Sequence, residues 1–255
     1  MTEQTLFRLR VRYVKQGRLR YLGHLEVLHT IERIIRRAQL PYAVTQGFSP
    51  HMRAGFCAAL PVGTASTCEW YDVFLTELVP VEEAFSRLRS ASPTDLAPVE
   101  VGYVDVRAAA LTAFITCATY EVKLWLTNPA VGEDAVREAL DAVRAQGTLP
   151  YLRGKKEKTL DLARTLAGYH VSTPSAGESA SDSPACVLTL DTRMDNDGAL
   201  RPEVLIGALN NYLAGTPDAP IHSTGIQDLA QVPRYEVTRT AQYALDDEGR
   251  PLSPL

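Results

Sequence analysis

The order in which strand and helix patterns follow one another constrains this chain most, because the same order occurs twice. In the first half, apolar and charged residues alternate as in a strand, and a pattern of apolar residues with helical spacing ends before Pro41. The expected elements are a strand at 5–17, a helix at 23–38, strands at 53–63 and 68–77, a helix at 80–91 and a strand at 97–107. This order is βαββαβ.

The second half repeats the order without obvious sequence identity. The expected elements are a strand at 114–126, a helix at 132–147, strands at 158–171 and 184–194, a helix at 201–215 and a strand at 232–245. Two βαββαβ units predict an α+β protein built from tandem ferredoxin-like folds, each an antiparallel sheet covered on one face by two helices. We expect domains at 1–108 and 109–255, with 172–184 as a disordered insertion because it has almost no bulky apolar residues.

The composition bounds the class of protein. With 255 residues and 45% hydrophobic content the chain can bury a large core, and it contains no apolar run long enough to span a membrane. We therefore expect a soluble, cytoplasmic protein. Its four cysteines lie far apart without metal-binding spacing, which predicts reduced core thiols.

Charge is distributed unevenly along the chain. Residues 1–60 hold ten Lys and Arg against three acids, a local charge of +7, although the whole chain carries −4. Clustered positive charge favours a polyanion such as RNA, while a merely solvated basic face is the alternative. We expect one RNA-binding surface formed by the strand, the helix and the loop that follows. Its candidate residues are Arg8, Arg10, Arg12, Arg20, His29, Arg33, Arg36, Arg37, Gln46, Phe48, His51 and Arg53.

A complete catalytic constellation is not visible in the sequence. It has no Gly-x-Ser-x-Gly elbow, no Cys/His signature and no phosphate-binding Gly-x-x-x-x-Gly-Lys loop. His24 and His29 are five residues apart and point in different directions on a helix, so we expect no metal and no cofactor. If the protein cleaved RNA, His24 and His51 would be the candidate acid and base, because metal-independent ribonucleases use histidine in this way.

Several motifs in the first half resemble one bacterial family. They are Lys15-x-Gly17-x-Leu19-Arg20-Tyr21, Gly23-His24-Leu25, Glu32-Arg33-x-x-Arg36-Arg37-Ala38-x-Leu40-Pro41, Gln46-Gly47-Phe48-Ser49-Pro50 and Leu60-Pro61-x-Gly63, followed by weaker matches at Arg201-Pro202, Arg239-Thr240 and Tyr243. Together they resemble the radical-SAM-linked proteins, a family of unknown function. The resemblance implies a companion of cobalamin-binding radical SAM enzymes, and the chain lacks those enzymes' Cys-x-x-x-Cys-x-x-Cys motif.

Three functions remain open from the sequence. The first is an accessory module that binds tRNA or rRNA and presents it to a radical SAM partner. The second is a metal-independent endoribonuclease of the CRISPR repeat-processing type, although the chain lacks the carboxy-terminal glycine-rich motif of those enzymes. The third is a protein–protein adaptor whose basic face docks the radical SAM enzyme. The absence of a complete catalytic constellation leaves enzymatic activity uncertain and favours a binding role.

Overall fold

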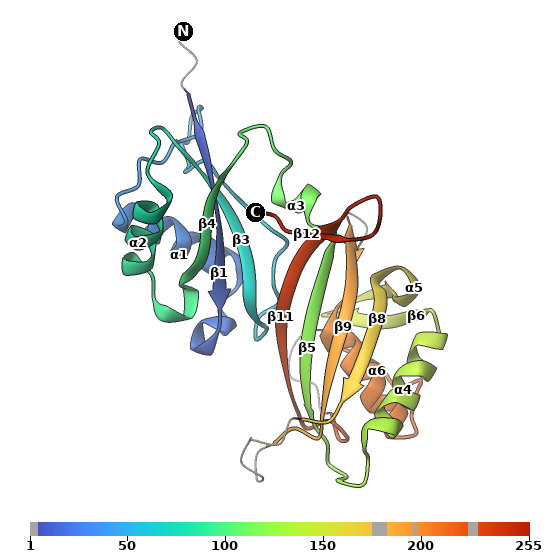
Figure 1. Cartoon of the computed structure of the whole chain (residues 1–255). Coiled ribbons are helices and arrows are strands. Elements are labelled where there is room, and N and C mark those ends of the chain that lie inside the picture. The colour runs from blue at the N-terminus through green and yellow to red at the C-terminus, as the bar shows by residue number, and fades with distance from the viewer. Residues whose placement is uncertain (1–4, 175–182, 196–197, 224–228) are drawn as a thin grey trace. The chain divides into compact units, whose positions relative to one another are not determined.

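The computed structural model describes residues 5–174, 183–195, 198–223 and 229–255 (Figure 1). The chain divides into two compact units: unit 1 comprises Met1–Thr116 and Arg239–Leu255, and unit 2 comprises Cys117–Thr238. The C-terminal segment thus belongs with unit 1, whereas the sequence predicted a division into 1–108 and 109–255. The predicted insertion at 172–184 falls mostly on 175–182, which lie outside the described residues.

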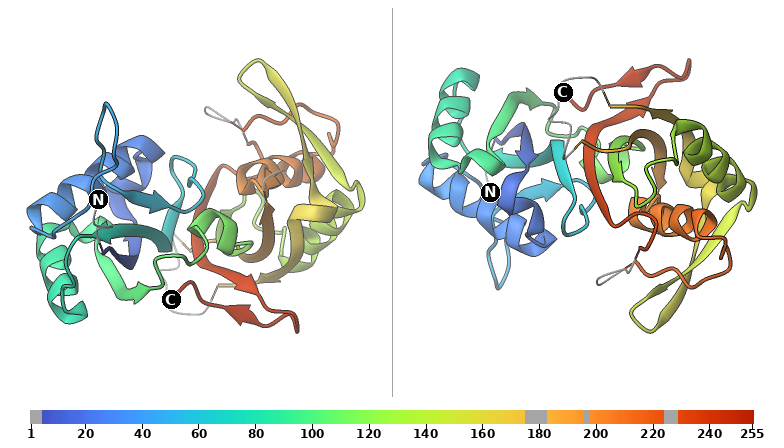
Figure 2. Two further views of the ribbon diagram at one scale, coloured as in Figure 1. Left: turned by 90° about the horizontal axis from the view of Figure 1, so that it is seen from above. Right: turned by 90° about the horizontal axis from the view of Figure 1, so that it is seen from below.

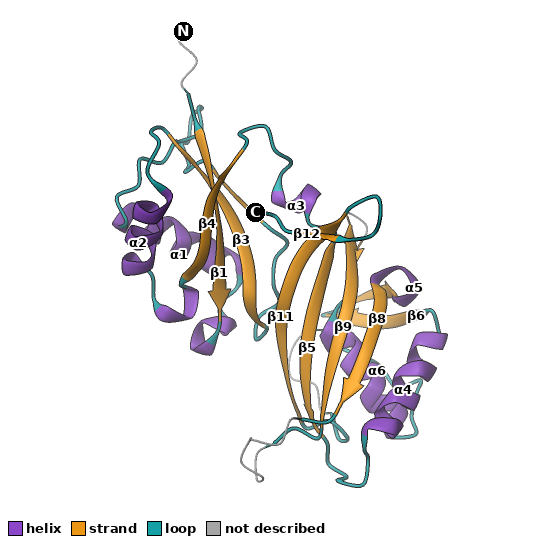
Figure 3. Cartoon of the chain, in the orientation of Figure 1, coloured by secondary structure: helices purple, strands orange, loops and turns teal. Residues whose placement is uncertain are grey.

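Unit 1 combines antiparallel strands with helices, as expected for an α+β protein (Figure 3). Its strands are β1 (Phe7–Lys15), β2 (Ala54–Phe56), β3 (Ala65–Leu75), β4 (Pro98–Val104), the end of β11 (Arg234–Leu245) and β12 (Pro251–Leu252). Its helices are α1 (His24–Arg37), α2 (Val81–Ala91) and α3 (Leu111–Phe114), with short 3-10 turns η1 (Gly17–Tyr21) and η2 (Thr94–Leu96). None of the helices in the described part of the chain is long and apolar enough to cross a membrane.

Strand β1 lies at the centre of the unit 1 sheet. It pairs antiparallel with β4 on one side and with β3 on the other, and β2 pairs antiparallel with the second half of β3. The part of β11 that belongs to unit 1 lies along the first half of β3, where Gln242 donates to the Cys68 carbonyl at 2.7 Å. Local strand order is therefore β4-β1-β3-β2. The strand predicted at 53–63 is much shorter than expected, because only Ala54–Phe56 pair with β3.

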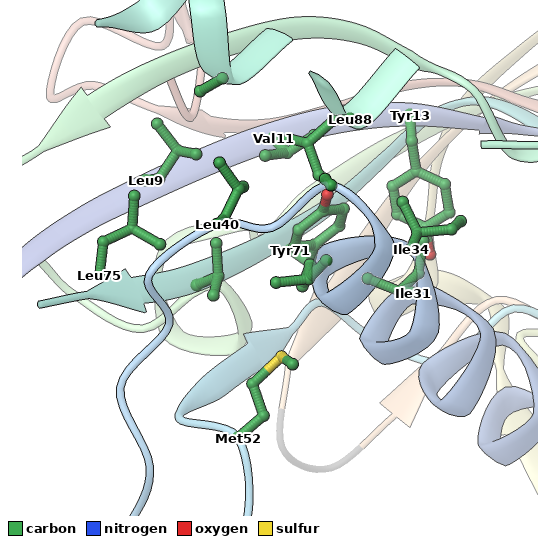
Figure 4. Close-up of a cluster of buried hydrophobic side chains, with 14 of the residues drawn as sticks. Leu9, Val11, Tyr13, Ile31, Ile34, Leu40, Met52, Tyr71, Leu75 and Leu88 are labelled. Atoms are coloured by element: carbon green, nitrogen blue, oxygen red, sulfur yellow. The ribbon is translucent and has the colours of Figure 1, made fainter. Parts of the chain in front are cut away.

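The core of unit 1 lies between the sheet and α1 and α2. Alternate residues Leu9, Val11 and Tyr13 of β1 point into it, since successive side chains of a strand face opposite sides. In Figure 4 Tyr13 lies near Ile31 and Ile34 of α1, whereas Leu9 lies near Leu75 of β3. All of these side chains are almost completely buried. Burying such a side chain stabilises the fold by about 1.5–3 kcal/mol. The apolar stripe therefore fixes which side of α1 faces the solvent.

Local hydrogen bonds fix both ends of α1. At its start the Gly23 amide donates to the Glu26 carboxylate at 2.7 Å, which satisfies one of the amides left unpaired at a helix start. At its end Gln39 adopts φ +53, its amide donates to the Arg36 carbonyl at 3.1 Å, and the Leu40 amide donates to the Ile35 carbonyl at 3.4 Å. This is the Schellman pattern, here with glutamine at the position that usually holds glycine.

Unit 2 repeats the arrangement of helices beside antiparallel strands. Strand β9 pairs antiparallel with β5 and with β8, which gives the local order β5-β9-β8. Helices α4 and α6 pack together and lie on one face of these strands (Figure 1). The elements are β5 (Cys117–Trp125), α4 (Glu133–Ala145), β6 (Thr148–Arg153), β7 (Lys156–Asp161), α5 (Leu162–Thr165), β8 (Leu166–Ser172), β9 (Cys186–Asp195), β10 (Gly198–Ala199) and α6 (Pro202–Leu213), before the start of β11.

One expected strand of unit 2 is in fact three elements. The sequence predicted a single strand at 158–171, but the end of β7, the short helix α5 and β8 occupy this stretch. The Asp161 side chain accepts a hydrogen bond from the Arg164 amide at 2.9 Å and so caps α5, which interrupts the extended chain. The segment between α4 and β8 consequently contains a separate hairpin, β6–β7, that the sequence did not reveal.

Candidate nucleic-acid interface

The exposed side of α1 carries a row of basic side chains. Because Val27, Ile31 and Ile34 occupy the buried side, the residues between them face the solvent. His29, Arg33, Arg36 and Arg37 are all exposed, as the sequence predicted for this helix. We call these four residues the α1 basic face.

Two members of the α1 basic face share one acidic neighbour. The Glu32 carboxylate lies 3.6 Å from His29 Nδ1 and 3.7 Å from Arg36 Nη2, and Arg36 is half-exposed. Arg33 and Arg37 have no ion-pair partner among the described residues. Glu32 is 17% exposed, but Arg36 reaches into solvent and 3.7 Å is long for an ion pair, so Glu32 does not prevent Arg36 from binding another anion.

A hollow between α1 and α2 extends the basic surface. Its volume is about 750 Å³, and Arg37 and Gln39 form one side of it while Ser86, Arg87 and Ser90 form the other. Arg87 pairs with Glu83 and donates to the Gln39 carbonyl at 3.4 Å. Sequence patterns did not indicate Arg87, because its place in the same hollow as Arg37 depends on how the two helices pack.

The loop after α1 ends in an exposed aromatic ring. A bridge between Val44 and Met52 closes the loop, and the Thr45 amide donates to the His51 carbonyl at 2.8 Å. Within it Gly47 has φ +137, a conformation that other residues rarely adopt. Phe48 at the tip is fully exposed, with a relative accessibility of 111%. A phenylalanine held in water without packing is suited to stack on a ligand such as a nucleobase.

Among the other candidate residues near the loop and the start of α1, two arginines contact aromatic side chains. Gln46, His51 and Arg53 are exposed, and the Arg53 guanidinium lies 4.4 Å from the centre of the Phe74 ring. Arg20 is half-buried, donates to the Tyr21 hydroxyl at 3.0 Å and lies 5.0 Å from the centre of that ring. Arg53 therefore keeps an exposed charge beside the loop, whereas Arg20 is already partly engaged.

The three arginines of β1 do not join the α1 basic face. Their neighbours Leu9, Val11 and Tyr13 point to α1, so strand alternation turns Arg8, Arg10 and Arg12 to the opposite side of the sheet. The predicted common surface of strand and helix arginines is thus corrected. Arg12 stays half-exposed, with Nε 2.8 Å from Glu100.

Arg8 and Arg10 are internal. They are 5% and 2% exposed, and both guanidinium groups bind Asp72, which is 1% exposed. Backbone carbonyl oxygens accept further hydrogen bonds from the two guanidinium groups: Arg8 donates to Ala109 at 3.0 Å and Arg10 donates to Pro254 at 2.7 Å. Buried guanidinium groups cannot reach a phosphate, so Arg8 and Arg10 are structural residues.

The two histidines considered for catalysis have different neighbours. The His24 ring at the start of α1 meets the Phe56 ring edge-on at 6.2 Å between centres. His51 Nε2 lies 3.4 Å from Ser49 Oγ in the loop. No contact joins the two histidines in the described part of the chain. Among the described residues no group of three or more His, Cys, Asp or Glu could hold a metal ion.

A second buried cluster surrounds Glu69 in unit 1, and the sequence did not reveal it. Arg239 of β11 binds Glu69, and the Cys57 thiol lies 3.6 Å from the same carboxylate. Burial, reinforced by Glu69, raises the pKa of Cys57 to about 12 and that of Cys68 to about 11. Reactive cysteines need a lowered pKa, so these thiols are inert. All four cysteines are buried and free of disulfides.

Fold and site together define an α+β protein with a basic, solvent-exposed helix face. The chain belongs to the family described as "Uncharacterized protein conserved in bacteria (DUF2344)", whose sequence model matches residues 8–202. This agrees with the expected family of unknown function, and the description mentions no radical SAM enzyme.

The other comparisons place few constraints on function. None of the curated proteins compared with the chain matches it. Among solved structures, the crystal structure of an unknown protein from Galdieria sulphuraria is 11% identical, with 74% of this chain and 81% of that chain covered and a TM-score of 0.23.

Proposed function

We propose that this protein is an RNA-binding accessory module that presents tRNA or rRNA to a cobalamin-binding radical SAM enzyme in the cytoplasm. The observation that carries the proposal is the α1 basic face, which holds three arginines and a histidine exposed on one side of one helix. The adjoining hollow adds Arg87 from α2. Arginines on a continuous exposed surface are suited to bind the phosphates of a nucleic-acid backbone.

The loop after α1 offers a contact to nucleobases, which phosphate contacts do not provide. Phosphate contacts position a nucleic acid without reading its bases, whereas unpaired bases of RNA stack on aromatic side chains. Phe48 is the exposed ring available for such stacking, with Gln46 and His51 as polar neighbours on the same loop. Arg53 carries a further charge next to it. This combination favours RNA with an accessible single-stranded segment over a regular duplex.

We also propose that the two units are tandem ferredoxin-like folds. Support comes from unit 1, where the antiparallel order β4-β1-β3-β2 and the two helices on one face are those of this fold. In unit 2 the order β5-β9-β8 and the pair α4 and α6 fit the same scheme, with the β6–β7 hairpin as an addition.

The radical SAM partner is inferred from the resemblance of the motifs around α1 and its loop. Co-purification of the chain with a cobalamin-binding radical SAM protein from the same cell tests the partner directly. A partner whose binding is unchanged by added RNA, together with no affinity of this chain for RNA, favours the adaptor function.

RNA affinity measured against salt concentration tests the proposed function. Fluorescence anisotropy with labelled tRNA between about 50 and 200 mM salt should show an affinity that falls steeply, by roughly 0.7–0.9 in log–log slope for each phosphate contact. An affinity that is absent or independent of salt contradicts the proposal. Intact RNA after incubation is expected, and cleavage abolished by His24→Ala or His51→Ala would instead establish the ribonuclease.

A further inference from the structure

The β6–β7 hairpin forms a sheet of its own in unit 2. Its two strands pair antiparallel from Thr148 and Asp161 at the base to Arg153 and Lys156 at the tip. Leu149 and Leu160 near the base are buried, whereas residues 153–159 are all exposed. In both views of Figure 2 the hairpin, coloured yellow-green, extends away from the helices of unit 2. The base is anchored and the tip projects into solvent.

The turn at the tip is short. Only Gly154 and Lys155 separate the paired residues Arg153 and Lys156, and Gly154 has φ +62. Glycine with positive φ at the first of two central positions is the pattern of a type II′ turn, which matches the natural twist of a hairpin. The turn therefore fixes the backbone at the tip of the hairpin, and with it the positions from which the side chains of the tip extend.

Positive charge is concentrated at this tip. Residues Cys117–Thr238 contain eleven Lys and Arg against sixteen Asp and Glu, yet four of the eleven fall within six positions, at Arg153, Lys155, Lys156 and Lys158. Glu157 is the one acid among these six positions. The three lysines have no ion-pair partner among the described residues. Like charges held together in this way repel one another, so the tip is suited to bind a polyanion.

A partly apolar hollow lies beside the charged tip. Its volume is about 550 Å³, and Tyr151, Leu152 and Lys158 of the hairpin face Pro220 and Ile221 across it. The Leu152 amide donates to the Ile221 carbonyl at 2.8 Å, which ties the two walls together. Glu157 and Asp218 also line the hollow, and Lys158 is the lysine that lines it. An aromatic ring beside this lysine suits a nucleotide, whose base stacks on the ring while its phosphate contacts Lys158.

We propose that the β6–β7 hairpin is a second RNA-binding element. Arg153, Lys155, Lys156 and Lys158 contact backbone phosphates, and Tyr151 stacks on a base in the hollow. This inference rests on the proposed function, since it takes RNA as the ligand, but it assigns the contact to residues of unit 2 outside the α1 basic face.

Salt-titrated binding of labelled tRNA by the full chain tests the hairpin. The triple variant Lys155→Ala, Lys156→Ala, Lys158→Ala should lower the log–log slope by about 2 and weaken binding at least tenfold at 50 mM salt. Tyr151→Leu, which keeps an apolar side chain, should weaken binding about tenfold with an unchanged slope, because stacking depends little on salt. Arg137→Ala, which removes a half-exposed cation of α4 that pairs with Glu133 and Asp134, is the control and should bind as the wild type.

The possible outcomes distinguish failure of the hairpin proposal from failure of the proposed function. Unchanged binding by the lysine triple variant, with weakened binding by an Arg33, Arg36, Arg37→Ala variant, overturns the hairpin and leaves the proposed function intact. The reverse result supports the hairpin and removes the α1 basic face from the interface. A wild type that binds no RNA overturns both. Polyglutamate that competes as well as unlabelled tRNA would indicate an acidic protein ligand and also overturn the hairpin's assignment to RNA.

Discussion

Arg239 of β11 and Glu69 of β3 form a bidentate ion pair within unit 1, 170 residues apart in the sequence. The Arg239 Nη2 group lies 2.6 Å from each carboxylate oxygen, and the two side chains are 1% and 5% exposed. The same strand segment supplies Gln242, which donates to the Cys68 carbonyl. The C-terminal segment is thereby fixed to the first unit by polar groups in its interior.

Removing one partner of this pair should destabilise the protein strongly. Glu69→Leu leaves the Arg239 guanidinium buried without its counter-charge, at an expected cost of about 3–5 kcal/mol in the free energy of unfolding. Glu69→Leu combined with Arg239→Met removes both charges and should recover a large part of this loss. Urea unfolding measures both. If the double variant is less stable than Glu69→Leu, the pair is not the cause of the loss.

Substitutions that affect the buried arginines of unit 1 should lower stability, whereas substitutions on the α1 basic face should weaken RNA binding. Asp72→Asn removes the counter-charge of Arg8 and Arg10 and should cost about 3–5 kcal/mol of stability. The folded fraction should retain the salt dependence of RNA binding. Arg36→Ala should do the opposite. The long pair of Arg36 with Glu32, at 3.7 Å, contributes at most about 1 kcal/mol to stability, but the log–log salt slope of RNA binding should fall by roughly 0.7–0.9. Unfolding and anisotropy measured on both variants check this, and a reduced slope for Asp72→Asn would contradict it.

The loop should contribute to RNA affinity through stacking. Phe48→Ala is expected to weaken binding by about 1–3 kcal/mol without altering the salt slope, because a stacked base carries no charge. Its folding stability should not change, since the ring is fully exposed. Gly47→Val should reduce affinity as well by reshaping the loop, because valine is strained at φ +137. Equal affinity of Phe48→Ala and wild type would exclude this loop from the interface.

Gln39→Gly should stabilise the protein. Gln39 ends α1 at φ +53, a conformation that costs a residue with a side chain about 1 kcal/mol and costs glycine almost nothing. The Schellman hydrogen bonds involve only the backbone at this position and are retained. Thermal and urea unfolding should show a gain of up to about 1 kcal/mol. Loss of stability would show that the Gln39 side chain contributes more than its backbone conformation costs.

Lys15 should make the free energy of unfolding depend on pH in the alkaline range. Its side chain is 2% exposed, and burial lowers the pKa of its ammonium group below the ordinary value, while Glu69 opposes part of this shift. Between the lowered pKa and about 10.4 the unfolded chain binds more protons than the folded one, so this residue's contribution to stability rises with pH. Lys15→Met should therefore be more stable than wild type at neutral pH, by a margin that shrinks toward pH 10.5. A margin that grows with pH contradicts this assignment.

The sequence by itself determined the local elements with strong periodicity. The spacing of Val27, Ile31 and Ile34 placed α1 and its basic side correctly, because an apolar stripe must face the core whatever it packs against. Alternation in β1 likewise identified a strand with an arginine side. The Gln46–Pro50 turn signals correctly located a loop, since glycine and proline restrict the backbone locally.

Only the tertiary structure decided which charged side chains are exposed and able to bind a ligand. Strand alternation could not show that Arg8 and Arg10 lie inside, because their partner Asp72 is 64 and 62 residues away in the sequence and their carbonyl acceptors lie farther still. Helix packing alone brought Arg37 opposite Arg87, and chain return alone brought Arg239 to Glu69. The β6–β7 hairpin was missed because its polar strands bury only Leu149 and Leu160, too few apolar positions to give a readable pattern. Burial of a charge depends on the long-range contacts that compensate it, and a local pattern does not contain them.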